Sequence, residues 1–246
     1  MADLAIIGGT GLTKLESLSI SGREIVHTPY GEPSGPLTHG QLFGKDIMFL
    51  ARHGYGHTIP PHKVNYRANL WALKEAGAKS VFAVAAVGGI RADMLPGQLV
   101  VPDQIIDYTW SRVNTFFEEG LKYVVHIDFT HPYSDALRKK ILQAAAAAKI
   151  SIIDGITYAA TQGPRLETAA EINRMERDGC GIVGMTGMPE AALARELNLD
   201  YATCAVVANW AAGRGAGVIT MKEIEAELAG GMKKVAAILE QLVKLV

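Results

Sequence analysis

Two side chains that can bind an anion follow an apolar run early in the chain. Arg52 and His53 come directly after residues 47–51 and are followed by a glycine. An arginine grips phosphate oxygens in a planar fork, and a protonated histidine adds a second positive charge. A solvated surface pair is the alternative. Three histidines between residues 53 and 62 also raise the question of zinc, but no cysteine accompanies them and the stretch is a loop by composition, without a His-x3-His helix, so no metal is expected.

A second candidate anion site lies in the stretch 182–190, Ile-Val-Gly-Met-Thr-Gly-Met-Pro-Glu. An apolar run enters a Gly-Met-Thr-Gly turn, and Pro189 then opens a helical segment, as proline does in a first turn. The free N–H groups and the dipole of a helix start favour an anion, to which Thr186 adds a hydroxyl. An ordinary strand-to-helix turn is the alternative, but other turns carry compatible chemistry.

A third glycine-rich turn, Gly-Gly-Thr-Gly, follows the apolar run 4–7. Such a turn lets the backbone approach a phosphate, and Thr10 offers a hydroxyl and an N–H. The spacing is neither the dinucleotide fingerprint GxGxxG nor a P-loop, because a third glycine and a Gly-Lys-Ser/Thr are both missing. A purely structural turn is the alternative.

These turns need regular elements to position them, and the apolar patterns predict strands alternating with helices. The expected strands are 4–7, 47–51, 81–87, 99–107 with Pro102 at its interior or edge, 155–161, 182–184 and 201–208. The expected helices are 64–76, 134–149, 168–178 with a capping box from Thr168 to Glu171, and 220–245 with a break or bend near Gly230-Gly231. Residues 110–123 are irregular and are predicted to form an excursion from the body.

This alternation indicates one α/β domain over residues 1–246, with a central mixed β-sheet flanked by helices. Ligands bind such sheets at the carboxyl ends of the strands. The candidate residues lie at or just past those ends, which is the strongest argument for a single site; they are Thr10, Arg52, His53, Ala85, Ala86, Glu167, Thr186 and Asn209.

Composition excludes several classes of protein. The 246 residues are 49% hydrophobic and 20% charged with a net charge of −1, which fits a compact globule and argues against nucleic-acid binding. The two cysteines are expected to be buried, reduced thiols. Neither a signal peptide nor a membrane-spanning run is evident, so we expect a cytoplasmic protein without membrane contacts.

Five motifs together resemble the purine nucleoside phosphorylase and methylthioadenosine phosphorylase family. The motifs are, in order, Gly-Gly-Thr-Gly-Leu, Ala-Arg-His-Gly, His-Lys-Val-Asn-Tyr-Arg-Ala-Asn, Gln-Gly-Pro-Arg-Leu-Glu-Thr and Gly-Met-Thr-Gly-Met-Pro-Glu, and the resemblance extends from residue 5 to about residue 228. The resemblance implies a nucleoside phosphorylase-like fold, a homotrimer, and cleavage of a purine nucleoside by inorganic phosphate. It implies no cofactor, because phosphate is a co-substrate.

The resemblance also assigns roles to the candidate residues. Phosphate would be bound by Thr10, Arg52, His53, the Ala85-Ala86 turn and Thr186, and Met185 would lie along the ribose. Position 85 departs from relatives that carry a hydroxyl or amide there, because Ala85 offers only its backbone.

Two positions indicate which base is bound. Glu167 and Asn209, the expected catalytic residues, are of the kind found in relatives that act on 6-oxopurines. A carboxylate accepts the N1 hydrogen of hypoxanthine, and one amide serves both O6 and the developing N7–H. Adenine presents an acceptor at N1 and a donor at N6, so this site rejects it. Leu166, Trp210 and Ala211 are expected to line the same pocket.

One position indicates the sugar. Relatives that cleave inosine carry a histidine where this chain has Met221, with Ile224 one turn further on. A thioether suits a 5′-methylthio group and leaves a 5′-hydroxyl unpaired. His126, with His131 as a second candidate, is expected to complete this pocket from a neighbouring subunit.

The expected reaction is therefore phosphorolysis of S-methyl-5′-thioinosine to hypoxanthine and 5-methylthioribose 1-phosphate. Three alternatives stay open. They are an inosine or guanosine phosphorylase, which Met221 argues against; a methylthioadenosine phosphorylase, which Glu167 and Asn209 argue against; and a non-catalytic or dinucleotide-binding α/β protein, which lacks GxGxxG.

Overall fold

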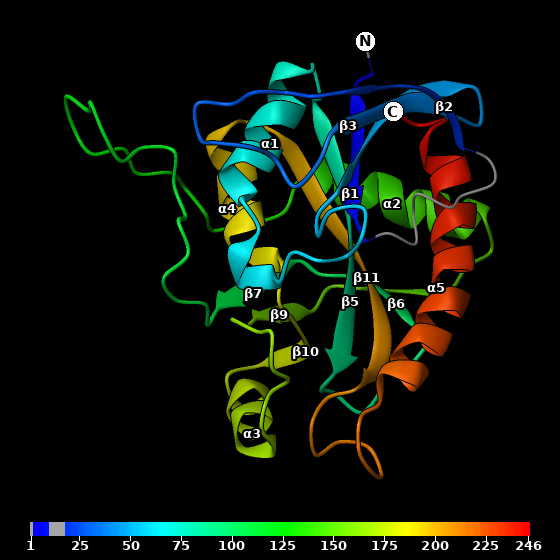
Figure 1. Cartoon of the computed structure of the whole chain (residues 1–246). Helices are drawn as coiled ribbons and strands as arrows, with labels where there is room; N and C mark the ends of the chain where they lie inside the picture. Colours follow the sequence, from blue (N-terminus) through cyan, green and yellow to red (C-terminus); the bar gives the residue numbers. More distant parts are fainter. Residues whose placement is uncertain (1, 10–17) are drawn as a thin grey trace.

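The computed structural model describes residues 2–9 and 18–246. The strands are β1 (Leu4–Gly8), β2 (Leu18–Glu24), β3 (Leu37–Leu42), β4 (Lys45–Ala51), β5 (Ser80–Gly89), β6 (Leu99–Val101), β7 (Gln104–Asp107), β8 (Ile152–Asp154), β9 (Thr157–Ala160), β10 (Cys180–Gly184) and β11 (Asp200–Trp210). The helices are the 3-10 turn η2 (Pro61–Lys63), α1 (Tyr66–Glu75), α2 (Asp135–Ala147), α3 (Ala169–Arg177), α4 (Gly187–Glu196) and α5 (Met221–Leu242) (Figure 1).

All the described strands belong to one sheet that is mixed in direction. Its main path runs β2-β3-β4-β1-β5-β10-β9-β7, and β11 continues from β5 to β6 and β8. The centre of the sheet is parallel: β1 pairs with β4 and β5, and β5 pairs with β11, all in the parallel direction. In contrast, β10 is antiparallel to β5. The predicted α/β fold with a central mixed sheet flanked by helices is confirmed.

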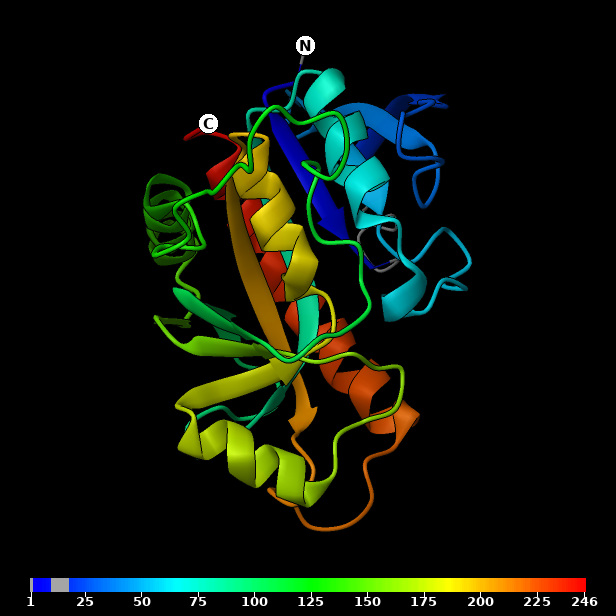
Figure 2. The ribbon, with the colours of Figure 1, turned by 90° about the vertical axis from the view of Figure 1, so that its left-hand side faces the viewer.

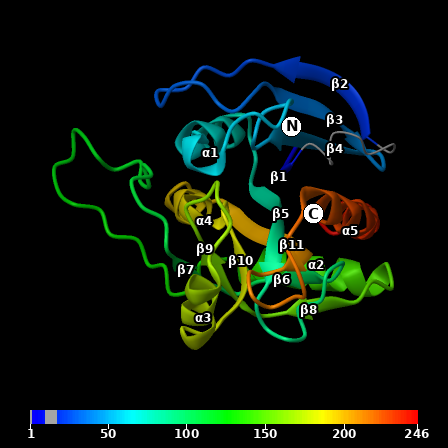
Figure 3. The same ribbon diagram turned by 60° about the horizontal axis from the view of Figure 1, so that its bottom comes forward.

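Helices cover both faces of the central strands. α1 and α4 lie on one face, and α2 and α5 lie on the other, as Figures 2 and 3 show from two directions. A hydrophobic core lies on each face of the sheet. Because side chains alternate along β1, Ala5 and Ile7 point into one core and Leu4 and Ile6 into the other. Because both faces are covered, β1 is buried along its whole length, as its continuous apolar run predicts.

The pairing of β5 leaves a gap along one of its edges. β11 follows the other edge from Ser80 to Gly89. On this edge β1 pairs only as far as Ala83, and β10 pairs only from Gly88 onward. Residues 84–87 therefore have no strand beside them here. Figure 1 shows β5 and β11 ending at the bottom of the molecule, the side on which α3 and the first turn of α5 lie.

Local sequence signals predict several elements correctly. The capping box at the start of α3 is present, with Thr168 accepting from the Glu171 amide and the Glu171 carboxylate accepting from the Thr168 amide. Ser134 caps α2 with its hydroxyl. In the segment assigned to α4, Met188 has extended backbone angles (φ −119°, ψ 140°), so the regular turns begin at Pro189 as predicted.

Four details of the sequence prediction are wrong. The expected strand 99–107 is two strands, β6 and β7, because Pro102 lies between them and they pair with different partners. The strand expected over residues 155–161 is shorter in the structure, where β9 covers Thr157–Ala160. α5 continues through Gly230-Gly231, where Gly231 packs closely against Val206. The strands β2 and β3 were not predicted, because the side chains of β2 are largely exposed and show no apolar run.

The excursion predicted over residues 110–123 is part of a longer irregular segment, residues 108–134, which is called the 108–134 excursion below. They contain no helix or strand and extend from the body as the green loop at the left of Figures 1 and 3. Several large apolar side chains of this segment are exposed: Trp110, Val113, Leu121, Tyr123 and Val124. None of the helices described is long and apolar enough to cross a membrane.

Candidate active site

The gap along β5 brings several predicted residues together. Ala86 is exposed in the middle of this strand, whereas Ala85 on its other face is buried. Gly88 pairs with Val183 of β10 on one edge and with Asn209 of β11 on the other. Residues from three distant parts of the chain thus meet at Gly88, near the carboxyl ends of β5 and β11.

Arg52 lies at one side of this gap, at the end of β4. Its backbone N–H bonds to the Gly8 carbonyl at 3.0 Å, and its Nη1 donates to the Val84 carbonyl at 2.9 Å. Its guanidinium is buried and forms a bidentate pair with Glu190, through Nε at 2.6 Å and Nη2 at 2.7 Å. Burial by itself lowers the pKa of Arg52, but the attraction of Glu190 outweighs burial and raises that pKa, so the charge is permanent.

In this structure the fork of Arg52 is paired with a carboxylate, and its predicted role in phosphate binding stays a prediction. The fork holds Glu190, which is fully buried and also accepts from the Tyr201 hydroxyl at 2.8 Å. Nη2 also donates to the Ile7 carbonyl at 3.5 Å, so among bonds to the part of the chain that the structure describes, only the second hydrogen of Nη1 is left to point at an anion. Glu190 is a residue that the sequence analysis placed only in the first turn of a helix.

The surroundings of His53 favour its neutral form at pH 7, and its predicted role in phosphate binding stays a prediction. Its Nδ1 donates to the Ile59 carbonyl at 2.8 Å, so Nε2 of the neutral ring is an acceptor. Burial, together with the Arg52 charge, lowers the pKa of His53 to about 4. A neutral imidazole with a bare Nε2 can accept a hydrogen from a protonated phosphate oxygen, but it cannot act as an anion-binding cation.

The turn after β10 is shaped by Tyr158 of β9. A Cβ on Gly184 would lie 2.2 Å from the Tyr158 hydroxyl oxygen, and a Cβ on Gly187 would lie 2.8 Å from Ile105. The Thr186 amide points to the same hydroxyl at 3.5 Å. Close packing therefore explains both glycines, and it holds Thr186 at the start of α4. Thr186 is largely buried and makes no capping bond with its own side chain.

Glu167 is tied to the end of β9. The Thr161 hydroxyl donates to Oε1 of Glu167 at 2.7 Å and also lies 3.2 Å from the Gly184 carbonyl. The Thr161 amide bonds to the same carbonyl at 2.8 Å. These contacts connect the loop that bears Glu167 to the turn that bears Thr186. Oε2 of Glu167 has no hydrogen bond to the part of the chain that the structure describes, so it is open to a donor.

Asn209 stands at an irregularity near the end of β11. The register shifts between Val207 and Asn209, and Asn209 then pairs with Gly88. Its Nδ2 donates to the Trp210 carbonyl at 2.6 Å, which orients the amide. Its second Nδ2 hydrogen and its Oδ1 have no partner among residues 2–9 and 18–246. One donor and one acceptor are therefore presented side by side.

The other residues predicted for the base and ribose lie around this point with different exposure. Met185 packs against Gly163, where a Cβ would come within 2.3 Å of its sulfur. Leu166 is exposed, Trp210 is half-buried, and Ala211 is buried with its amide bonded to Gly89. The roles of these residues in binding a base or a ribose stay predictions.

Three predicted residues do not join an enclosed pocket within one chain. Met221 begins α5 and is 66% exposed, and Ile224 is half-buried. His126 is exposed on the 108–134 excursion, which extends away from the ends of β5 and β11. Thr10 lies outside the described residues. The 5′ side of the predicted site is therefore open in the isolated chain.

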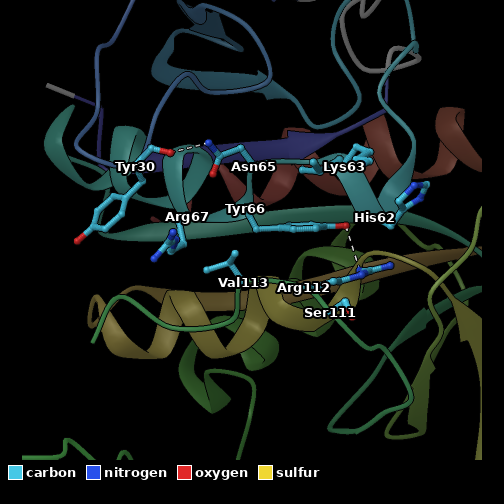
Figure 4. A pocket seen from close by; sticks show the side chains of 10 residues that line it. Tyr30, His62, Lys63, Asn65, Tyr66, Arg67, Ser111, Arg112 and Val113 are labelled. Carbon is cyan, nitrogen blue, oxygen red and sulfur yellow. Dashed lines mark hydrogen bonds between the residues drawn. The ribbon is translucent and has the colours of Figure 1, made fainter. Parts of the chain in front are cut away.

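Arg112 is a second residue that the sequence analysis missed. It comes from the excursion, and its guanidinium donates to backbone carbonyls at the ends of both β9 and β10. No periodicity or motif marks it in the sequence. It also lines a cavity of about 340 Å³ between the start of α1 and residues 111–113, shown in Figure 4, to which none of the predicted site residues contributes.

Comparison with known proteins identifies relatives over the whole chain. The model of the Phosphorylase superfamily matches residues 3–244. A protein of Pseudomonas syringae pv. tomato named "Probable S-methyl-5'-thioinosine phosphorylase" is 57% identical over 242 residues, which cover 98% of each chain. The "6-oxopurine nucleoside phosphorylase" of Pyrococcus furiosus is 45% identical over 91% of this chain and 85% of its own.

The fold has solved counterparts as well. The structure of methylthioadenosine phosphorylase from Schistosoma mansoni in complex with adenine superimposes with a TM-score of 0.94. The two sequences are 32% identical, and the superposition covers 100% of this chain and 92% of the Schistosoma mansoni chain.

Proposed function

The chain belongs to the phosphorylase superfamily, and from this premise we propose that it cleaves S-methyl-5′-thioinosine with inorganic phosphate. The products are hypoxanthine and 5-methylthioribose 1-phosphate. The observation that carries the proposal is the pair of groups at the strand ends: the open Oε2 of Glu167 and the open donor and acceptor of Asn209.

These groups match the edge of a 6-oxopurine. Oε2 of Glu167 accepts the N1 hydrogen of hypoxanthine, while Nδ2 and Oδ1 of Asn209 serve O6 and N7–H. Adenine would set its bare N1 against the carboxylate and its N6 hydrogens against the Asn209 donor. Buried polar groups left unpaired in this way lower the rate by about 10⁴-fold. Relatives named for 6-oxopurine and methylthioinosine substrates support this choice of base.

The proposed reaction is a displacement at C1′ of the sugar. Phosphate bound beside the gap in β5 lies below the ribose, so its attack is intramolecular within the complex. The C1′–N9 bond breaks as a phosphate oxygen bonds to C1′, and the electron pair passes to the purine, which takes a proton at N7. Asn209 accepts that N7–H, and Glu167 holds N1–H while charge builds on the ring. The proposal requires no metal or organic cofactor.

The proposal includes a homotrimer in the cytoplasm. Exposed apolar side chains on the 108–134 excursion need a covering surface, and the open side of the site near Met221 needs further walls. A neighbouring copy that contributes His126 would meet both needs. The two buried free thiols, Cys180 and Cys204, suit a reducing compartment. Light scattering on the purified protein measures the mass of the assembly, and a monomer would contradict this part.

A phosphate-dependent assay on four nucleosides tests the substrate. We expect release of base from methylthioinosine to exceed release from methylthioadenosine, inosine and adenosine, compared as kcat/KM. A preference for either adenine nucleoside would overturn the base assignment, and a preference for inosine would overturn the sugar assignment. Omitting phosphate must abolish cleavage, since simple hydrolysis would mean a different reaction.

One substitution addresses the base directly. Asn209→Asp replaces the Nδ2 donor with a second carboxylate oxygen, which suits the N6 hydrogens of adenine. We expect the ratio of kcat/KM for methylthioadenosine over methylthioinosine to rise. An unchanged ratio would mean that Asn209 does not read the base.

A further inference from the structure

The guanidinium of Arg112 joins two loops that are otherwise separate in the sequence. Its Nη2 donates to the carbonyls of Thr161 at 3.1 Å and Gln162 at 2.8 Å, just past β9. Its Nη1 donates to the carbonyls of Met185 at 2.8 Å and Met188 at 2.6 Å, just past β10. One side chain thus holds four backbone carbonyls on two adjacent strand ends.

These contacts use the positive charge of Arg112 without a carboxylate partner. Its Nε donates to the side-chain carbonyl of Gln162 at 3.2 Å, and Nη1 lies 3.3 Å from the Tyr66 hydroxyl. No carboxylate lies within ion-pair distance of Arg112 in the described ranges, although most other arginines that are partly buried have one. The side chain is therefore committed to the carbonyl dipoles of the two loops.

The two loops carry the groups that the proposed function needs. The loop after β9 leads to Glu167, and the turn after β10 contains Met185 and Thr186. We propose that Arg112 is a positioning residue that sets the spacing between the base-reading loop and the phosphate-binding turn. The proposal rests on the proposed function for its kinetic consequence, but the clamp itself is a property of the protein without substrate.

An arginine is needed for this task because of its shape. A planar guanidinium presents Nη1 and Nη2 on separate edges, so it can reach carbonyls on two strands at once. Lysine keeps the charge but places its three donors at one point, so it can bond one loop well and the other poorly. Arg112→Lys therefore changes the geometry while preserving the charge, and it is the variant that tests positioning.

The experiment compares Arg112→Lys with a matched control on the far side of the sheet. Arg138 of α2 also bonds a strand-end carbonyl, that of Pro102 at 3.0 Å, and pairs with Asp154. It touches none of the site residues. Arg138→Met tests the loss of a partly buried arginine in general.

We expect Arg112→Lys to lower kcat/KM for the nucleoside by about 100-fold, the usual loss for a displacement of about 1 Å at a reacting centre. We expect Arg138→Met to leave kcat/KM of the folded enzyme unchanged even where it lowers Tm. In Arg112→Ala, added guanidinium ion at non-denaturing concentration should restore part of the activity, because Arg112 lines a cavity of about 340 Å³ that has room for the ion (Figure 4). Sodium chloride at the same ionic strength should restore none.

Hydrogen exchange in the absence of substrate separates this proposal from the proposed function. The Thr161 amide bonds to the Gly184 carbonyl across the two loops, so we expect faster exchange in segments 161–168 and 184–190 of Arg112→Lys and not of Arg138→Met. Unchanged exchange there, or unchanged kcat/KM, would overturn the positioning role. Global unfolding of both Arg112 variants would also overturn it, since the residue would then be a general stabiliser. If the native protein cleaves no nucleoside, the proposed function is wrong. The hydrogen-exchange rates of segments 161–168 and 184–190 still show whether Arg112 holds the two loops together.

Discussion

Glu190→Gln is expected to cost the protein a large part of its stability. Glu190 is fully buried and accepts three short hydrogen bonds, two from Arg52 at 2.6 and 2.7 Å and one from Tyr201 at 2.8 Å. The substitution keeps the shape but removes the negative charge, and it turns an N–H group toward the guanidinium. Removing one partner of a buried pair costs about 3–5 kcal/mol, because the remaining charge is left uncompensated.

This cost is a large part of the total stability, since the free energy of unfolding of a domain is about 5–15 kcal/mol. Urea denaturation followed by circular dichroism, at one fixed protein concentration, measures it. The matched control is Asp93→Asn, which breaks the exposed pair with Arg91 and should change the free energy of unfolding by less than about 1 kcal/mol.

A double variant distinguishes a paired charge from simple packing. Arg52→Met combined with Glu190→Leu replaces the pair with apolar side chains, which is often neutral in a buried position. We expect the double variant to be more stable than either single variant. The reasoning would be refuted if Glu190→Gln cost no more than the Asp93 control, or if the two single effects simply added.

The remaining predictions concern pH, packing and the sugar. The pKa of His53 is lowered from 6.5 to about 4, so between these pH values the unfolded chain binds a proton more readily than the folded chain. The free energy of unfolding should therefore fall by about 3 kcal/mol as the pH drops from above 6.5 to below 4. His53→Gln should flatten the pH profile of the free energy of unfolding in this range. Gly184→Ala forces a methyl group against Tyr158 and should cost about 1–3 kcal/mol by urea denaturation, whereas Gly230→Ala, in open space on α5, should not. Met221→His should shift kcat/KM toward inosine relative to methylthioinosine, and no shift would remove Met221 from the sugar pocket.

Much of the architecture follows from local signals in the sequence. The buried strands β1, β4, β5, β10 and β11 have continuous apolar runs, and the start of α3 has a capping box, so pattern and propensity agree with the fold. The division of residues 99–107 into two strands does not follow from pattern alone. It depends on which neighbours each half pairs with, which is a property of the assembled sheet.

The parts of the site that the sequence does not predict depend on contacts between distant residues. Arg52 and Glu190 are 138 positions apart, and no local rule announces that the arginine will pair with a glutamate. The neutral state of His53 depends on burial and on the Ile59 carbonyl, which only the folded loop provides. Arg112 lies in an irregular segment whose sequence carries no period, so its contacts appear only when β9 and β10 are placed side by side.

The resting state of Glu167 and Asn209 bears on how the proposed site would discriminate between bases. Without substrate, Glu167 accepts from Thr161 and Asn209 donates to Trp210, so each side chain already has one partner and a fixed orientation. A correct base then adds hydrogen bonds to the open positions without first breaking a strong one, and exchanging water for a base contributes only about 0.5–1.5 kcal/mol per bond. A wrong base instead leaves those positions buried and unpaired, at about 1–3 kcal/mol each. Under the proposed function, selectivity therefore comes mainly from the penalty against the wrong base, and the orientation of Glu167 and Asn209 by their protein partners matters more than the strength of any single contact.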